Sequence, residues 1–228
     1  MLTRIIIFLV LLFNNKVLAE LPLVEYNPQG ARNGPTILED ITSRCTPDDI
    51  QRGYDNDPET RTHELQHQLN SRIRNIYGGT GNVNSVYLGK GYAWVMKEPK
   101  VTLSQVAQNV ADQYKNSTYK LYLIDQQRYW QNEPLYITDE LSAYYAGALY
   151  ARQAGIKDHG SRGRFISFLH YTEALISTIK QRDPNYQDLQ ALINLLEFYK
   201  ERNGELDKYE NFFRRNHRLQ LPRIRIIN

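Results

Sequence analysis

Residues 57–78 read DPETRTHELQHQLNSRIRNIYG, and this stretch predicts the first long helix of the chain. Asp57 is a suitable N-cap, and Pro58 suits the first helical position. Glu59 favours the positively polarised helix end. Because no further proline or glycine follows until Gly78, the helix should run for about five turns.

The two faces of this helix differ in character. Its polar face carries His63, His67, Asn70 and Arg74. The opposite face carries Thr62, Leu65, Leu69, Ile73 and Ile76. We therefore expect the apolar face to meet the core and the polar face to be free for a site.

Beyond Gly78 the hydrophobic period changes from that of a helix to that of a strand. Apolar residues alternate through 83–88 and again through 92–96, with Gly89 and Lys90 between them, which predicts a β-hairpin. Residues 119–125 are rich in Tyr, Leu and Ile and suggest a third strand. A small sheet is expected from these segments.

The second half of the chain is predicted to be helical. Thr102 and Gln105 form a capping box for a helix that reaches about residue 114. Three longer helices are expected at 139–153, 164–182 and 186–202, the last closed by Gly204. The fold class is therefore α+β and mostly helical, with a helical C-terminal part at 164–228.

Residues 20–56 contain several prolines and glycines with little periodicity, so we expect an extended, loop-rich segment. Together with the helices and the sheet, this segment forms a single predicted domain over residues 20–228.

Residues 1–19 have the features of a secretory signal peptide. Arg4 precedes a nine-residue apolar run at 5–13, and small residues end at Ala19, where cleavage is expected. The run is far shorter than the roughly 20 residues of a membrane helix, so no transmembrane segment is expected. The predicted location is secreted or periplasmic.

The charge balance gives no sign of a nucleic-acid partner, and the basic tail and the single cysteine each have a structural interpretation. Without Arg4 and Lys16 of the predicted signal peptide, the chain has 26 basic and 25 acidic residues. This nearly balanced net charge does not indicate a nucleic-acid partner. A basic tail follows Glu210, and we interpret it as a solvated helix end with a packed final strand. The single Cys45 is interpreted as a buried or free thiol, with a metal-blocking role as the weaker alternative.

A pattern of metal ligands lies within the first helix. His63, Glu64 and His67 follow the spacing His-Glu-x-x-His, which brings both imidazoles to one face, one turn apart. Two histidines at this spacing can share a metal ion, and a zinc ion needs a third protein ligand while one position stays open for water. The alternative is two unrelated surface histidines on a polar face.

Glu140 is the candidate for the third ligand, because it lies on a predicted helix whose small residues, Ala143 and Gly147, permit close helix approach. Glu133, Asp139 and Glu173 are rivals, and the remaining histidines, His159, His170 and His217, stay open. Tyr144 or Tyr145, one turn further on, could donate a hydroxyl to a developing oxyanion.

Residues 63–74 and 138–147 together resemble the zincin metallopeptidases of the gluzincin type, in which two histidines and a downstream glutamate hold zinc. The resemblance implies a zincin-like core, His63, His67 and Glu140 as Zn²⁺ ligands, and Glu64 as general base. Asn70 and Asp139 would support the ligands. The sequence departs from thermolysin-like enzymes because Glu140 lies 73 residues after His67 and is followed four positions later by Tyr144 rather than an acid.

We therefore expect an exported zinc metallopeptidase that hydrolyses a peptide or protein substrate with a metal-activated water. The hairpin at 83–96 is the expected edge along which an extended peptide would bind. One alternative is a zinc amidase acting on cell-wall peptides. The other is a noncatalytic secreted binding protein on the same scaffold.

Overall fold

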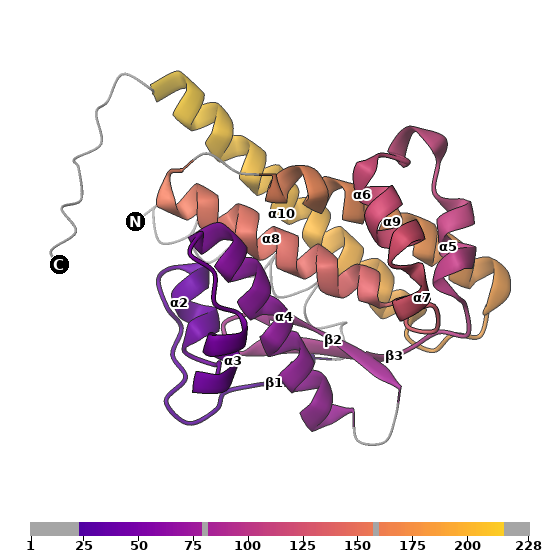
Figure 1. The fold of residues 1–228 in the computed structure, drawn as a ribbon, viewed down its shortest axis with the longest axis horizontal. Helices are drawn as coiled ribbons and strands as arrows, with labels where there is room; N and C mark the ends of the chain where they lie inside the picture. The colour runs from indigo at the N-terminus through magenta and orange to yellow at the C-terminus, as the bar shows by residue number, and fades with distance from the viewer. Residues whose placement is uncertain (1–22, 79–81, 157–159, 217–228) are drawn as a thin grey trace, which may run out of the picture.

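The computed structural model describes residues 23–78, 82–156 and 160–216. The described chain is α+β and mostly helical, which confirms the predicted fold class (Figure 1). The predicted signal peptide and the end of the basic tail lie outside these residues. The strands are β1 (Leu23–Glu25), β2 (Val83–Gly89) and β3 (Tyr92–Lys97). The helices are α2 (Ile37–Thr42), α3 (Pro47–Arg52), α4 (Pro58–Tyr77), α5 (Leu103–Asn109), α6 (Ser117–Tyr119), α7 (Gln127–Trp130), α8 (Tyr136–Ala154), α9 (Ser161–Arg182) and α10 (Leu189–Asn216), with short turns η1 (Asp112–Tyr114) and η2 (Lys120–Asp125).

Helix α4 has the predicted limits. The Asp57 side chain accepts a hydrogen bond from the Thr60 N–H at 3.0 Å, and the helix ends at Gly78. The prediction of a free polar face is wrong, because Asn70 on that face is fully buried. On the apolar face, Ile76 near the end of the helix is 56% exposed. Helix α4 is therefore enclosed on two sides, and its polar face contacts other elements of the fold.

The predicted hairpin is confirmed as β2 and β3. Its turn has positive φ angles at Gly89, Lys90 and Gly91. Gly91 has a φ of 84°, a conformation that strains residues with a side chain, and a Cβ there would also meet the Asn27 side chain, so glycine is favoured at this position. The third strand is β1, which pairs antiparallel with β3 and gives the sheet order β1-β3-β2.

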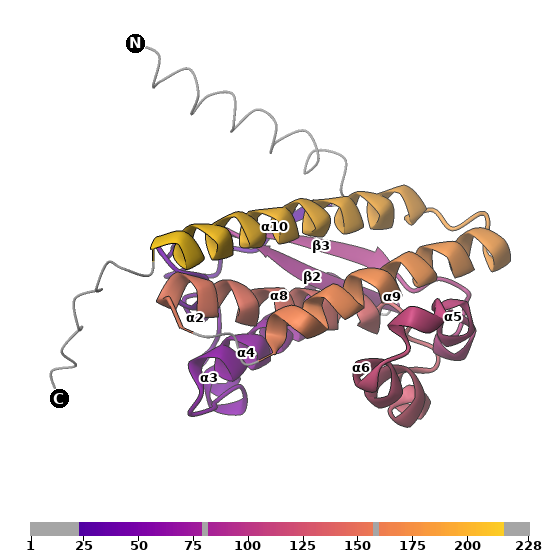
Figure 2. The same ribbon diagram turned by 90° about the horizontal axis from the view of Figure 1, so that it is seen from above.

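The sheet separates two hydrophobic clusters, because alternate residues of a strand point to opposite faces. Val86 and Trp94 join the larger cluster, to which α5, α8, α9 and α10 contribute. Tyr87 and Ala93 join the smaller cluster with residues of α2 and α4. Figures 1 and 2 show α8, α9 and α10 packed beside one another, with α4 next to α8.

Residues 119–125 are not a strand. They continue from α6 into η2, a π-helical turn in which the Gln126 N–H donates to the Leu121 carbonyl. Asn116 caps the start, since its side chain accepts from the Tyr119 N–H at 3.0 Å. Tyr122 and Leu123 are buried in succession, a pattern that a strand facing one core cannot produce.

The described part of the predicted extended segment, residues 23–56, is less extended than predicted. It contains α2 and α3, which both start with capping boxes, at Thr36 with Glu39 and at Thr46 with Asp49. Each helix has six residues, too few for a recognisable hydrophobic period.

Two helix ends also differ from the sequence prediction. Helix α5 ends at Asn109, because Val110 adopts an extended conformation before the short turn η1. Helix α10 continues through Gly204 to Asn216, so this glycine does not close it. A single glycine costs a helix only about 1 kcal/mol, which neighbouring residues can offset.

None of the helices within the described residues is both long enough and apolar enough to cross a membrane.

Glu98 links the end of β3 to the start of α8. Its carboxylate accepts a hydrogen bond from the Leu135 N–H at 3.0 Å. Burial raises the pKa of Glu98 to about 8, the hydrogen bond from Leu135 opposes this, and the nearby Glu133 carboxylate adds to the increase. A carboxyl with a raised pKa binds a proton more tightly in the folded state, so it stabilises the fold at low pH.

We therefore expect the free energy of unfolding to fall by roughly 2–4 kcal/mol, through this group, as the pH rises from about 5 to about 9. Glu98→Gln keeps the acceptor for Leu135 but does not ionise, so its stability should depend less on pH. Urea unfolding of both proteins at several pH values measures the difference. Parallel stability curves would contradict the assignment.

Candidate metal centre

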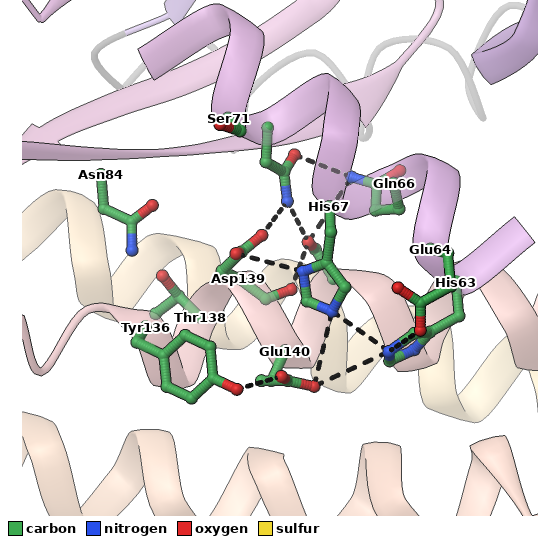
Figure 3. Close-up of polar contacts among 12 residues, drawn as sticks. His63, Glu64, Gln66, His67, Ser71, Asn84, Tyr136, Thr138, Asp139 and Glu140 are labelled. Carbon is green, nitrogen blue, oxygen red and sulfur yellow. Dashed lines mark hydrogen bonds and ion pairs between the residues drawn. The ribbon is translucent and has the colours of Figure 1, made fainter. Parts of the chain in front are cut away.

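Helices α4 and α8 bring together the histidine pair and Glu140 (Figure 3). His63 and His67 lie one turn apart on α4, and their ring centroids are 4.6 Å apart. Glu140 lies in the second turn of α8, which packs along α4. Glu140 is far from the histidine pair in sequence, because the hairpin β2–β3 and several short helices lie between α4 and α8.

The three potential donor atoms form a compact triangle. The two Nε2 atoms of His63 and His67 are 3.1 Å apart. Glu140 Oε2 lies 3.9 Å from His63 Nε2 and 3.6 Å from His67 Nε2. These separations allow one metal ion to contact all three atoms, so the group can bind a metal.

The two oxygens of the Glu140 carboxylate differ, because one accepts a hydrogen bond and the other accepts none from the described residues. Oε1 accepts a hydrogen bond from the Tyr136 hydroxyl, one turn earlier on α8. Oε2 is buried and accepts no hydrogen bond from the described residues. A buried carboxylate oxygen without a hydrogen bond is costly, and a cation bound by this oxygen and the two imidazoles would reduce that cost.

The second ring nitrogen of His67, Nδ1, contacts Asp139, and this contact orients the ring. Its Nδ1 lies 3.1 Å from Asp139 Oδ2, and the Asn70 side-chain amide donates to the other Asp139 oxygen. Asn70 Oδ1 in turn accepts the Tyr87 N–H of β2 at 2.8 Å. This chain of contacts fixes the imidazole orientation and leaves Nε2 directed at Glu140.

The two histidines have opposite pKa shifts. Burial lowers the pKa of His63 to about 2, and the charges of His67 and Arg164 act in the same direction. Burial alone would lower the pKa of His67 as well, but Asp139 and Glu140 raise it well above its usual value. His63 is therefore neutral and ready to bind a metal ion. His67 lies between two carboxylates, and a bound cation can replace its proton, so the two histidines are a suitable ligand pair.

Glu64 lies beside the triangle rather than in it. Its side chain is 45% exposed, and Oε1 is 3.9 Å from His63 Nε2. Partial burial raises the pKa of Glu64, the charge of His67 opposes this, and Glu140 adds to the increase. A partly exposed carboxylate with a raised pKa can exchange protons with a molecule bound at the centre.

Tyr144 faces the centre, whereas Tyr145 faces away from it. The Tyr144 ring packs 4.3 Å from the His63 ring, and its hydroxyl pairs with the hydroxyl of Tyr122 on η2. Tyr145 packs against Phe165 and Tyr199 in the helical core. Of the two predicted tyrosines, only Tyr144 therefore lies next to the histidine pair.

The rivals to Glu140 have other partners or positions. Asp139 contacts His67 Nδ1 and lies outside the triangle, as does Glu133. Glu173 pairs with His170 at 3.0 Å and with Lys200 at 3.1 Å on a separate surface. His159 and His217 lie outside the described residues.

The hairpin edge beside α4 is closed to a peptide at Tyr87. The Tyr87 N–H donates to Asn70, and its carbonyl accepts from the Gln66 side chain at 2.9 Å. Across the hairpin, β3 already pairs with β1. The predicted binding edge is therefore wrong at this position, since the backbone groups of Tyr87 already bond to side chains of α4.

Cys45 does not reach the centre. Its Sγ lies 4.0 Å from the Leu65 carbonyl and packs with the smaller hydrophobic cluster. Burial raises the pKa of this thiol to about 12, and the nearby Asp49 adds to the increase. Only a thiolate would bind a metal well, so the position favours the interpretation of Cys45 as a packed thiol.

The sequence reasoning missed several residues that support the centre. Tyr136 lies four residues before Glu140, but the predicted helix start at 139 excluded it. Gln66 and Tyr122 had no sequence signal, because their roles depend on contacts with β2 and α8. Helix capping rules alone do not reveal such contacts.

Comparisons of the chain with known protein families, curated proteins and solved structures gave no match.

Proposed function

We propose that this protein is an exported zinc-dependent metallopeptidase with a zincin-like core. The observation that carries the proposal is the triangle of His63, His67 and Glu140 with Glu64 beside it. Tetrahedral coordination with bonds of about 2.0–2.1 Å places donor atoms about 3.3–3.4 Å apart. The separations of 3.1, 3.6 and 3.9 Å bracket this value.

The donor set favours zinc over harder cations. Two imidazole nitrogens and one carboxylate oxygen suit Zn²⁺, whereas magnesium and calcium prefer oxygen ligands. Three protein ligands leave a fourth position open, which is the arrangement of catalytic zinc sites. The absence of a second buried acid in the triangle also favours a single ion within the described residues.

Zinc at this site would polarise the substrate carbonyl and lower the pKa of water to about 7. Glu64 then takes a proton from the attacking water and delivers it to the leaving amine. Its partial exposure lets it reach the reacting atoms, and its raised pKa suits a group that acts first as base and then as acid.

Tyr144 on α8 and Tyr122 on η2 are the candidates for stabilising the oxyanion that forms during hydrolysis. The Tyr144 ring packs against the His63 ring and its hydroxyl pairs with that of Tyr122, so that one of these hydroxyls can donate to the oxyanion of the substrate. A π-helical turn often occurs at functional sites, which is consistent with the position of Tyr122 on η2.

Asp139→Asn should weaken zinc binding by about 10–100-fold, because it weakens the hydrogen bond that orients His67 and removes the adjacent charge. Competition with a chromogenic chelator measures the affinity. Asp112→Asn alters an exposed aspartate on η1 and should leave zinc affinity unchanged. Equal loss in both variants would remove the specific role of Asp139.

The activity itself is tested with the mature chain from residue 20, loaded with zinc and incubated with a mixed peptide library. Mass spectrometry of the products identifies cleaved bonds. Cleavage that stops with a chelator and returns with zinc supports the proposal. A protein that holds zinc but cleaves no peptide would contradict it and favour the noncatalytic binding protein.

A further inference from the structure

Three helices meet at Gly147 of α8. A Cβ at this position would lie 2.8 Å from Ser161 Oγ on α9 and 3.3 Å from the Glu59 carbonyl oxygen on α4. The Ser161 N–H also donates to the Glu59 carboxylate at 3.3 Å. Because glycine has no side chain, the helix backbones approach closely and their relative positions are fixed.

About one turn from this contact, the three helices carry His63, Tyr144 and Arg164. The His63 and Tyr144 rings are 4.3 Å apart. The guanidinium carbon of Arg164 lies 5.6 Å from the centroid of the Tyr144 ring. A continuous set of contacts therefore leads from a metal-ligand candidate to a fixed positive charge.

Arg164 is available to a ligand. Its side chain is exposed, while His63 and Tyr144 are buried. No carboxylate in residues 23–78, 82–156 or 160–216 forms an ion pair with it. A Cβ at the neighbouring Gly163 would have no atom within 4 Å, so this position of α9 is open.

We propose that Arg164 binds a carboxylate of the substrate, so that the enzyme selects peptides with a negative charge close to the cleaved bond. This inference rests on the proposed peptidase function. A guanidinium presents parallel N–H donors that match the two oxygens of a carboxylate. Contact with the Tyr144 ring limits its motion, which reduces the entropy lost on binding.

The carboxylate could be the C-terminus of a peptide or an acidic side chain, and two pairs of probes separate these sources. Each probe is a succinyl hydroxamate, which binds zinc, coupled to one amino acid. The first pair carries Ala with a free carboxylate or Ala amide. The second pair carries Asp amide or Asn amide, so each pair differs by one carboxylate.

Calorimetry on the zinc-loaded mature chain measures binding without any turnover. In at least one pair, we expect the carboxylate probe to bind about tenfold or more tightly than its amide. Arg164→Gln should remove this preference and Arg164→Lys should retain part of it. Arg182→Gln changes an exposed arginine at the far end of α9 and should leave the preference intact.

The outcomes separate this inference from the proposed function. Equal binding within both pairs, or a preference that persists in Arg164→Gln, would overturn the carboxylate site while the zinc centre stands. Failure of all four hydroxamates to bind the zinc-loaded chain would overturn the open zinc position that the proposed peptidase function requires, and the inference with it.

Discussion

Glu64→Gln should reduce peptide hydrolysis by roughly 10²–10⁴-fold while zinc stays bound. Glutamine has nearly the same shape as glutamate but cannot accept the proton of the attacking water. Because the three donor atoms of the triangle belong to other residues, the substitution leaves the ligand set unchanged. The loss should therefore appear in kcat, with little change in metal content.

The measurement compares cleavage of a peptide from the library screen with elemental analysis of the same samples. Glu201→Gln makes the same chemical change at an exposed position of α10 and should keep the full rate. If Glu64→Gln retains both its zinc and its rate, Glu64 is not the base. If it loses zinc as well, Glu64 takes part in holding the ion.

His63→Ala and Glu140→Ala should each lower zinc affinity by about a hundredfold or more, since each removes one of three protein ligands. Elemental mass spectrometry of the purified mature chain should find about one zinc ion in the wild type. Both variants should lose most of it. His170→Ala is the matched control, because His170 pairs with Glu173 on a different surface.

The gain in thermal stability on adding zinc is a second measurement of binding at the same site. Zinc at about a thousand times its dissociation constant should stabilise the wild type by about 4 kcal/mol, because it binds the folded chain. Neither ligand variant should gain this stabilisation, whereas His170→Ala should. Loss of zinc in His63→Ala with retention in Glu140→Ala would mean that another group supplies the third ligand.

Much of the fold followed from local signals. Asp57, Pro58 and Gly78 defined both ends of α4, because capping and chain-breaking act over a few residues. The turn at 89–91 likewise identified the hairpin. Residues 119–125 were mistaken for a strand, since a short apolar run does not distinguish a strand from a buried helical turn.

Part of the candidate site also followed from local sequence signals, and part depended on the tertiary structure. The sequence by itself determined that His63 and His67 share a face with Glu64 beside them, because helix geometry fixes the relation of residues four apart. It also supplied Glu140 as one of several acids. Only the tertiary structure selected Glu140, placed Asp139 behind His67 and brought Arg164 to Tyr144. These contacts depend on how α4, α8 and α9 cross at Gly147, and such close approaches are set by packing across the whole fold.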